Sequence, residues 1–455
     1  MRRHPRLAPA ALALSLALGC RAPHAAPAPA IVLVTLEGLR PDALGAFGGP
    51  PRLTPALDRF SAEADWAGIA VASAGSPGPA LVSLMTGLPP HQHGSWSAGR
   101  PRLHAELESL AEGLRGAGYR TAAYREGDLL RRQQSLAQGF DIYEPANPRP
   151  RLLAALRTLR DQRDFLWLHS SLPGGEPLVL RERFRDRLPE STQELPRRLH
   201  GGDDDAAADP AVRRALYLSN VAQADLEVGE ILAELRDHGA WDRALVVVVG
   251  VTGWSPAINR ARAGGLERDQ LEVPLLIKLP RGTAWRLTPP RGERVASDRL
   301  LGTLLEAGGA TPVPAAARSL FRPGPGGVLS ERFAANGVND FSWLRGDLRL
   351  VRSVEFASPE PEYDAARERA ARRAGAPTRE PSRRILRRLN RAFLRTPPYS
   401  GGPHRLSLER WLPGGACQPV EDAAATAELS AALDRAFFAF LDDERPPGKD
   451  ESPSE

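Results

Sequence analysis

Three stretches decide the fold: IVLVTLEGLRPDALGAFG (31–48), TPALDRFSAEA (54–64) and GPALVSLMTGLPPHQHG (78–94). The first begins with an unbroken apolar run over 31–35, which is typical of a strand buried on both faces. In the second, Thr54 stands at a helix-cap position and Pro55 at the first helical position, so we expect a helix through Phe60. The third stretch predicts a helix over 79–86. A buried strand followed by helices favours an α/β fold.

The same alternation continues along the chain, which at 455 residues can bury one large core and a smaller one. Residues 174–210 form a variable segment between predicted elements. It ends in an acidic, low-complexity run at 201–210, which we expect to be a solvated loop. The remaining elements predicted from apolar periodicity are helices over 107–116, 211–239 and 298–307 and strands over 119–124, 165–171, 244–250 and 272–280. The pattern predicts a mostly parallel sheet with helices on both faces.

The pattern of predicted elements changes after the Pro/Gly-rich stretch at 321–328. Short alternating strands are expected over 329–357, arginine-rich helices over 365–395, a strand at 405–411 and a closing helix at 428–441. This order predicts a small C-terminal α+β unit.

Several of these motifs, taken together and in this order, resemble the sulfatase family of the alkaline phosphatase superfamily. The motifs are LRPDALGAFG (39–48), TPALDRF (54–60), LMTGLPPHQHG (84–94), QGFDIYE (138–144) and LEVPLLIKLP (271–280). The resemblance is good over 31–310 and loose over 329–440. It implies an α/β fold with a mostly parallel central sheet, helices on both faces and a small C-terminal α+β subdomain. The expected division is a signal peptide (1–20), a Pro/Ala tether (21–30), a sulfatase-like domain (31–320), a small subdomain (329–441) and a disordered tail (442–455).

The resemblance also implies where the chemistry should lie, and there this chain departs from the family. The family's nucleophile position falls on Pro77, which has no nucleophilic side chain, although Ser76 is adjacent. The family's metal positions fall on Glu37, Val251 and Thr252, and of these only Glu37 could coordinate. Calcium or another divalent metal is implied for active relatives. We therefore expect neither a catalytic nucleophile nor a metal cofactor here.

Glu37 has two open interpretations. It could coordinate a metal, one methylene longer than the family's aspartate, or it could be a partly buried carboxylate satisfied by Arg40 or by backbone amides. Gly38 occupies the place where a second ligand can sit. His169 matches a family histidine, whereas the next one is replaced by Gly174.

The supporting cations of the family are replaced as well. Their positions fall on Arg125, Glu126 and Asp128, and near Gly264 or Gly265. Acidic residues at such places oppose the negative charge that develops during ester cleavage.

Two functional hypotheses from different classes follow. The first is a sulfatase-like protein that has lost ester hydrolysis and acts as a binding or scaffold protein for an unknown protein or for a sulfated or phosphorylated ligand. The second is an active, metal-dependent sulfate or phosphate ester hydrolase that uses displaced residues. The candidates for those are Glu37, Asp42, Ser76, His91 and His93.

The N-terminus predicts attachment to a membrane. MRRHPR precedes a short apolar run that ends in LGC (18–20), as in a bacterial lipoprotein signal, so lipidation of Cys20 is expected. The alternative is an ordinary secretory signal cut near 25–30. Either interpretation places the protein in the bacterial cell envelope, periplasmic or cell-surface. The basic amphipathic segment 383–395 could instead lie on anionic lipid or pack on its own domain.

Composition adds little about partners. The net charge is +5 and the sequence pI about 9.6, yet only Lys278 and Lys449 are lysines. Basic residues are not interleaved with aromatic ones, so we do not expect a nucleic-acid partner. If Cys20 is lipidated or removed, only Cys417 remains, and no intramolecular disulfide can form.

Overall fold

The computed structural model describes only part of the chain. The described residues are 28–96, 102–103, 107–126, 130, 136–145, 155–157, 159, 163–174, 179–193, 209–255, 265–290, 292–310, 319–324, 326–333, 338–355 and 404–442. The predictions for Cys20, for 1–20, for 365–395 including 383–395, and for Asp128 and Gly264 lie outside these residues. Within the described part, no helix is long and apolar enough to span a bilayer.

The first sheet has the order β4-β3-β5-β1-β6-β7-β2-β8 and is mostly parallel. Only β7 runs antiparallel to its neighbours β6 and β2. Its strands are β1 (Ala30–Glu37), β2 (Trp66–Val71), β3 (Arg120–Arg125), β4 (Ile142–Pro145), β5 (Asp164–Pro173), β6 (Ala244–Gly250), β7 (Glu272–Lys278) and β8 (Val295–Ala296). The predicted fold class is confirmed.

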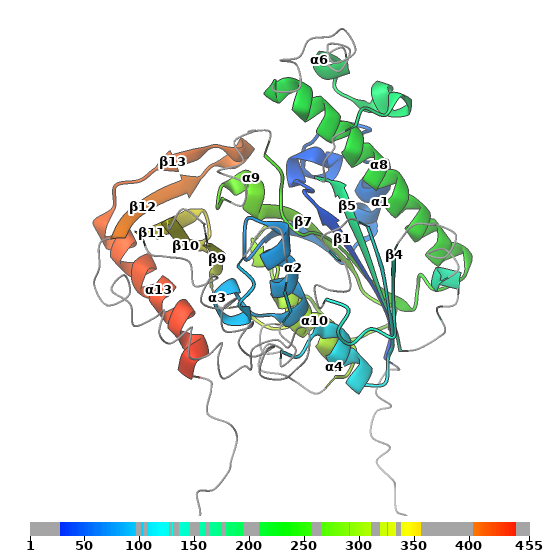
Figure 1. The fold of residues 1–455 in the computed structure, drawn as a ribbon. Helices are drawn as coiled ribbons and strands as arrows, with labels where there is room; N and C mark the ends of the chain where they lie inside the picture. Colours follow the sequence, from blue (N-terminus) through cyan, green and yellow to red (C-terminus); the bar gives the residue numbers. More distant parts are fainter. Residues whose placement is uncertain are drawn as a thin grey trace, which may run out of the picture.

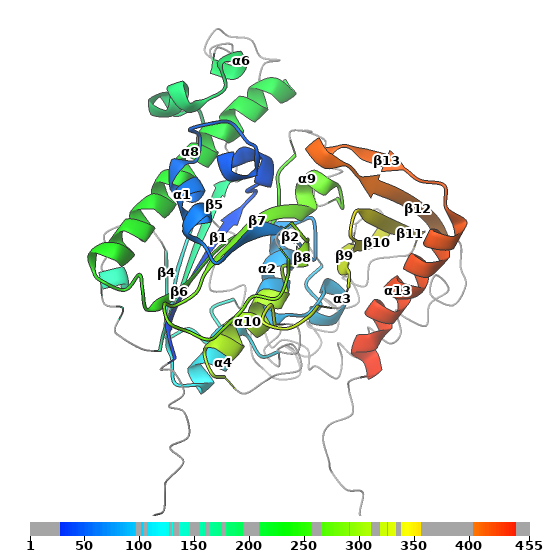
Figure 2. The same ribbon diagram turned by 180° about the vertical axis from the view of Figure 1, so that it is seen from behind.

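Helices cover both faces of this sheet. Alternate residues of β1 face opposite sides, and both sets are buried, as the unbroken apolar run predicted. One face packs against α1 (Pro55–Glu63) and α8 (Pro210–Asp237), and the other against α2 (Pro77–Thr86), α4 (Leu110–Gly116) and α10 (Arg299–Ala307) (Figures 1 and 2). Shorter elements are η1 (Pro41–Ala43), η2 (Gly45–Phe47), α3 (Pro90–His93), η5 (Glu182–Arg187), α6 (Glu190–Gln193) and α9 (Arg268–Leu271).

A second, antiparallel sheet follows in the order β13-β12-β11-β10-β9. Its strands are β9 (Val328–Arg332), β10 (Val338–Arg345), β11 (Leu348–Glu355), β12 (His404–Trp411) and β13 (Cys417–Pro419), with η9 (Pro413–Gly415) between the last two. Helix α13 (Ala423–Asp442) lies along one face of it, and its Leu429, Leu433 and Phe437 pack on the strands. The C-terminal α+β subdomain is therefore present.

Strand β9 joins the two sheets. Its Glu331 amide donates to Ser73 O at 2.9 Å, and the Ser330 hydroxyl donates to Ala72 O at 2.7 Å. The same Glu331 carboxylate accepts from the backbone amide of His91 at 2.9 Å and lies 2.5 Å from His91 Nδ1. The second sheet is thus fastened to the segment that leads from β2 into α2.

Several predicted boundaries differ in instructive ways. Helix α2 begins at Pro77, two residues before the prediction, because a proline is acceptable at the first helical position. Helix α4 begins at Leu110 because Ser109 and Glu112 form a capping box that ends the preceding loop.

Thr54 is the N-cap residue of α1 and Pro55 its first residue, as predicted, but Thr54 does not satisfy the helix amides. The Thr54 side chain makes no cap bond to the helix and donates instead to Asp58 Oδ1 at 3.1 Å. The first amides of the helix, those of Ala56 and Leu57, donate to the Asp225 carboxylate of α8 at 3.0 and 2.8 Å. A cap supplied from far along the chain leaves no local sequence signal.

Asp225 should make stability depend on pH. Burial raises its pKa from 3.8 to about 6, although the two helix amides and Arg187 oppose that rise. The folded state then holds a proton more tightly than the unfolded state, so the stabilisation is complete below 3.8 and is lost as the pH rises through about 6. We expect the free energy of unfolding of wild type, relative to Asp225→Asn, to fall by about 2–3 kcal/mol between about pH 4 and pH 7. Urea unfolding of both proteins at the two pH values measures this difference, and parallel profiles would contradict it.

Candidate functional site

The candidate site lies where the parallel strands end. Glu37 is the last residue of β1, His169 lies on the neighbouring β5, and Val251 follows β6 on the other side of β1. Strand β2 runs in the same direction, since β7 is antiparallel to both β6 and β2, and it leads through Ser76 into α2. The carboxyl ends of parallel strands are the usual position of a ligand site in α/β sheets.

Glu37 is paired with His169. Its Oε1 lies 3.0 Å from His169 Nε2, and both side chains are largely or fully buried. The other ring nitrogen, Nδ1, lies 2.8 Å from Thr35 Oγ1, which accepts a hydrogen bond from Trp167 Nε1 at 2.9 Å. Because an ionised carboxylate can only accept, His169 Nε2 carries the proton in this pair. With its proton in place, His169 Nε2 has no lone pair to offer a metal, and Glu37 Oε1 is engaged by it.

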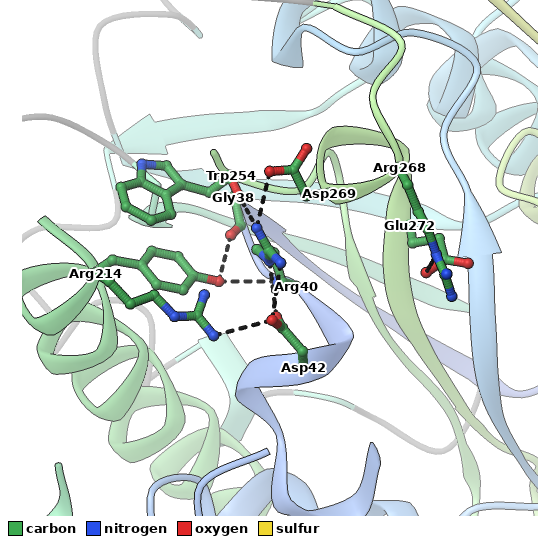
Figure 3. A network of polar contacts seen from close by, with 9 residues as sticks. Gly38, Arg40, Asp42, Arg214, Trp254, Arg268, Asp269 and Glu272 are labelled. Carbon is green, nitrogen blue, oxygen red and sulfur yellow. Dashed lines mark hydrogen bonds and ion pairs between the residues drawn. The ribbon is translucent and has the colours of Figure 1, made fainter. Parts of the chain in front are cut away.

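The prediction that Arg40 or backbone amides would satisfy Glu37 is wrong. Arg40 turns toward other partners, as Figure 3 shows: it donates to both carboxylate oxygens of Asp42 at 2.8 and 2.9 Å, to Asp269 at 3.1 Å and to Trp254 O at 2.9 Å. Arg40 lies beyond the glycine that follows Glu37, where the chain enters η1. The pairing of β1 with β5 instead brings His169 close to Glu37.

Gly38 and Gly174 touch through their backbones. A Cβ atom added to Gly38 would lie 2.4 Å from Gly174 Cα, and one added to Gly174 would lie 2.8 Å from Gly38 Cα. The contact is held by a hydrogen bond from the Gly174 amide to Glu37 O at 2.8 Å. Gly38 also has a φ of +74°, which favours glycine. The resemblance implies a possible metal ligand at Gly38 and a histidine at Gly174, and here neither position can carry a side chain without movement.

The positions after β6 are closed as well. Val251 is 1% exposed and packs in the core between the sheet and α2, so its side chain is not directed to a ligand. Thr252 is also buried. A Cβ on Gly253 would lie 1.9 Å from Asp269 O, while the Gly253 amide donates to Gln270 O at 2.8 Å.

The predicted nucleophile position is structural. Pro77 is the first residue of α2, and Ser76 precedes the helix with extended backbone and no side-chain cap bond. Ser76 is 9% exposed. Within the residues that the structure describes, no imidazole or carboxylate forms a hydrogen bond with the Ser76 hydroxyl, so no adjacent base activates it there.

The two histidines of the PPHQHG motif have structural roles. His91 contacts Glu331 and stacks on Phe437 with ring centroids 4.0 Å apart. His93 Nδ1 accepts from the Ser95 amide, and its Nε2 lies 3.0 Å from Ser83 Oγ. Burial, with His91 nearby, lowers the pKa of His93 to about 3, so its ring is neutral.

The positions of the family's cations also serve packing. The Arg125 guanidinium lies over the Tyr143 ring, 5.0 Å from its centroid, and the Glu126 carboxylate accepts from Ser170 Oγ at 2.7 Å. Neither residue brings positive charge to Glu37.

A rim network that was not predicted surrounds the end of β1 (Figure 3). Tyr217 of α8 donates to Gly38 O at 2.9 Å and accepts from the Arg40 amide at 3.1 Å, and burial raises its pKa to about 12. Its ring stacks on Trp254, with centroids 4.3 Å apart. Arg214 donates to Asp42 Oδ2 at 3.1 Å, so Asp42 lies between two guanidiniums. Nothing local in the sequence pointed to Tyr217 or Trp254.

These residues do not fit a divalent cation. A hard cation needs several oxygen ligands, and of the predicted positions only Glu37 bears a carboxylate, which His169 already engages. Within the described ranges, no three His, Cys, Asp or Glu side chains gather as a metal-binding group.

Comparison with solved structures finds the same fold. A putative sulfatase from Bacteroides thetaiotaomicron superposes with a TM-score of 0.54 at 17% identity, covering 72% of this chain and 83% of that one. A phosphonate monoester hydrolase from Silicibacter pomeroyi gives 0.57 at 16%, covering 92% and 96%. An alkaline phosphatase superfamily protein from Vibrio parahaemolyticus gives 0.53 at 15%, covering 92% and 88%.

No curated protein matches the sequence. At these identities the structural likeness shows the fold alone. The sequence model of the family described as Sulfatase, however, matches residues 29–310, which is more than half of the chain. The chain therefore belongs to the sulfatase family.

Proposed function

We propose that this sulfatase-family protein no longer hydrolyses sulfate or phosphate esters and acts as a binding or scaffold protein. The observation that carries the proposal is that Glu37, the only carboxylate among the predicted metal positions, is already paired with His169. Pro77 at the nucleophile position supports it, since helix α2 uses the proline as its first residue. A nucleophile and a Lewis acid would be lacking together.

The alternative is an active hydrolase that uses displaced residues. It would need Glu37, Asp42, Ser76, His91 and His93 to converge on one point. Their contacts argue against this, because Glu37 is held by His169, Asp42 by two arginines, His91 by Glu331 and His93 by Ser83. Ser76 alone could not supply an activated nucleophile.

Turnover assays test the proposal directly. We expect purified wild type to show no hydrolysis of aryl sulfates or aryl phosphates above background. Removing one transition-state donor from an enzyme costs about 2.7–4 kcal/mol, and here several contributions would be missing. Pro77→Ser is not expected to restore activity, since the metal position is still occupied by valine and threonine. Wild-type turnover that disappears in Ser76→Ala would favour the displaced-residue enzyme.

We also propose where the protein lies in the cell. We place the protein at a membrane of the bacterial cell envelope, anchored through a lipid on Cys20, with an unknown protein or a sulfated or phosphorylated ligand as its partner and no nucleic acid. Cys20→Ala should move the protein from the membrane to the soluble fraction after cell lysis, because a single short signal then no longer carries lipid. A Cys417→Ala variant is the matched control and should stay with the membrane. Membrane retention of Cys20→Ala would contradict the anchor.

A further inference from the structure

We infer that an internal contact has taken the place of the divalent cation: the Glu37–His169 pair and the Gly38–Gly174 backbone contact hold the ends of β1 and β5 where the family resemblance implies a metal. The inference rests on the proposed function and concerns the same site. Its test reads metal content and thermal stability, so its failure can be told apart from the appearance of turnover.

Gly38 and Gly174 leave no room for a side chain between the ends of β1 and β5. Their Cα atoms are close enough that a Cβ on either one would meet the backbone of the other, at 2.4 Å from Gly174 Cα or 2.8 Å from Gly38 Cα. Real side chains do not tolerate such contacts with backbone, which cannot rotate away. The strand pairing is also irregular here, since Leu36 is paired with Ser170 but Glu37 with Pro173. This irregularity brings Gly174 over Gly38 and fills the space from the backbone side.

Glu37 and His169 form a buried hydrogen-bonded pair at the same place. His169 Nε2 presents a proton to Glu37 Oε1 at 3.0 Å, whereas a metal would need the nitrogen lone pair. Nδ1 is turned away toward Thr35 inside the core. A cation could use His169 Nε2 as a ligand only after that nitrogen lost its proton and the buried pair was broken, and of the predicted metal positions only Glu37 would offer it a carboxylate.

One consequence is specific to this arrangement. Restoring ligand-type side chains one at a time should not recreate a metal site. Gly38→Asp and Gly174→His should each open the backbone contact and lower Tm, and added Ca²⁺ or Mg²⁺ should not reverse the loss. Gly38→Asp is expected to lower Tm by about 5 °C or more, because both the contact and the positive φ oppose it.

Gly48→Asp is the matched control. Gly48 also has a positive φ, +87°, but a Cβ there would meet nothing within 4 Å. The fall in Tm of Gly48→Asp therefore measures the cost of the positive φ without the backbone contact. We expect this fall to be clearly smaller than the fall in Tm of Gly38→Asp.

The experiment uses the full chain after dialysis against Ca²⁺ or Mg²⁺, with metal content measured by elemental analysis and Tm measured with and without EDTA. We expect wild type to retain no stoichiometric metal and to have the same Tm in both conditions. Stoichiometric metal in wild type with a Tm that falls in EDTA would overturn the inference. So would a Gly38→Asp/Gly174→His variant that takes up the cation and melts at or above wild type.

A second arm covers the case in which the glycine variants do not fold. Glu37→Gln keeps an acceptor for His169 Nε2–H, whereas Glu37→Ala removes it. We expect Glu37→Ala to lose more Tm than Glu37→Gln, with neither restored by Ca²⁺. Equal Tm values for the two variants, or restoration of either by Ca²⁺, would contradict the role of the pair.

Discussion

Replacing Glu331 with alanine is expected to lower the free energy of unfolding by about 3–5 kcal/mol, the range found when one partner of a buried pair is removed. The Glu331 side chain is fully buried and accepts from two donors of His91, the backbone amide and the ring. Alanine would remove both acceptor oxygens inside the protein. The effect should be large because β9 fastens the second sheet to the segment before α2 at this residue.

Urea unfolding of three variants measures this effect. Glu355→Ala is the matched control, since Glu355 is an exposed glutamate of the same sheet, and it should change stability by less than about 0.5 kcal/mol. Glu331→Gln keeps one acceptor oxygen and should fall between the two. A Glu331→Ala variant as stable as its Glu355→Ala control would mean that this pair does not hold the sheets together.

Replacing Gly253 with alanine is expected to cost about 3 kcal/mol, near the upper end of what overpacking a tight site costs. The added Cβ would lie 1.9 Å from the backbone oxygen of Asp269, and the Gly253 amide is held by Gln270 O. The two segments that flank the end of β6 would have to separate. Asp269 also receives a hydrogen bond from Arg40, so the rim network should loosen with them.

Gly116→Ala is the control for this substitution, because a Cβ at Gly116 would meet nothing within 4 Å. That variant should be as stable as wild type or slightly more stable, since alanine favours a helix by about 0.5–1 kcal/mol over glycine. Denaturant unfolding compares the two. Gly253→Ala with wild-type stability would show that the Gly253–Asp269 contact is looser than described here.

The fold could be predicted because its signals are local. The unbroken apolar run of β1 predicts a strand buried on both faces, and the structure confirms it. Helix α8 and strand β6 were found within two residues of their observed bounds, because apolar periodicity repeats over their whole length. A boundary differed where side-chain interactions decide it, as at α4, whose start is set by the capping box of Ser109 and Glu112. The contact of Asp225 with the first amides of α1 was not predicted, because Asp225 lies far along the chain.

The candidate site could be predicted only in part. The motif order located Pro77, Glu37 and Val251 at the ends of strands and at the start of α2, and the structure brings these segments together. Two interpretations of Glu37 stayed open at the level of sequence. Arg40, one of the partners considered, is near in sequence but lies beyond the positive-φ Gly38 and turns to Asp42 and Asp269.

By itself, the sequence determined the family resemblance, the layered α/β fold and the absence of a nucleophilic side chain at residue 77, since these depend on residue identity and on periodicity along the chain. Only the tertiary structure decided that Glu37 pairs with His169, that Gly38 touches Gly174 and that Glu331 fastens the second sheet to His91. These contacts join residues more than 100 positions apart. Strand order and register decide which of them meet, and no local pattern carries that information.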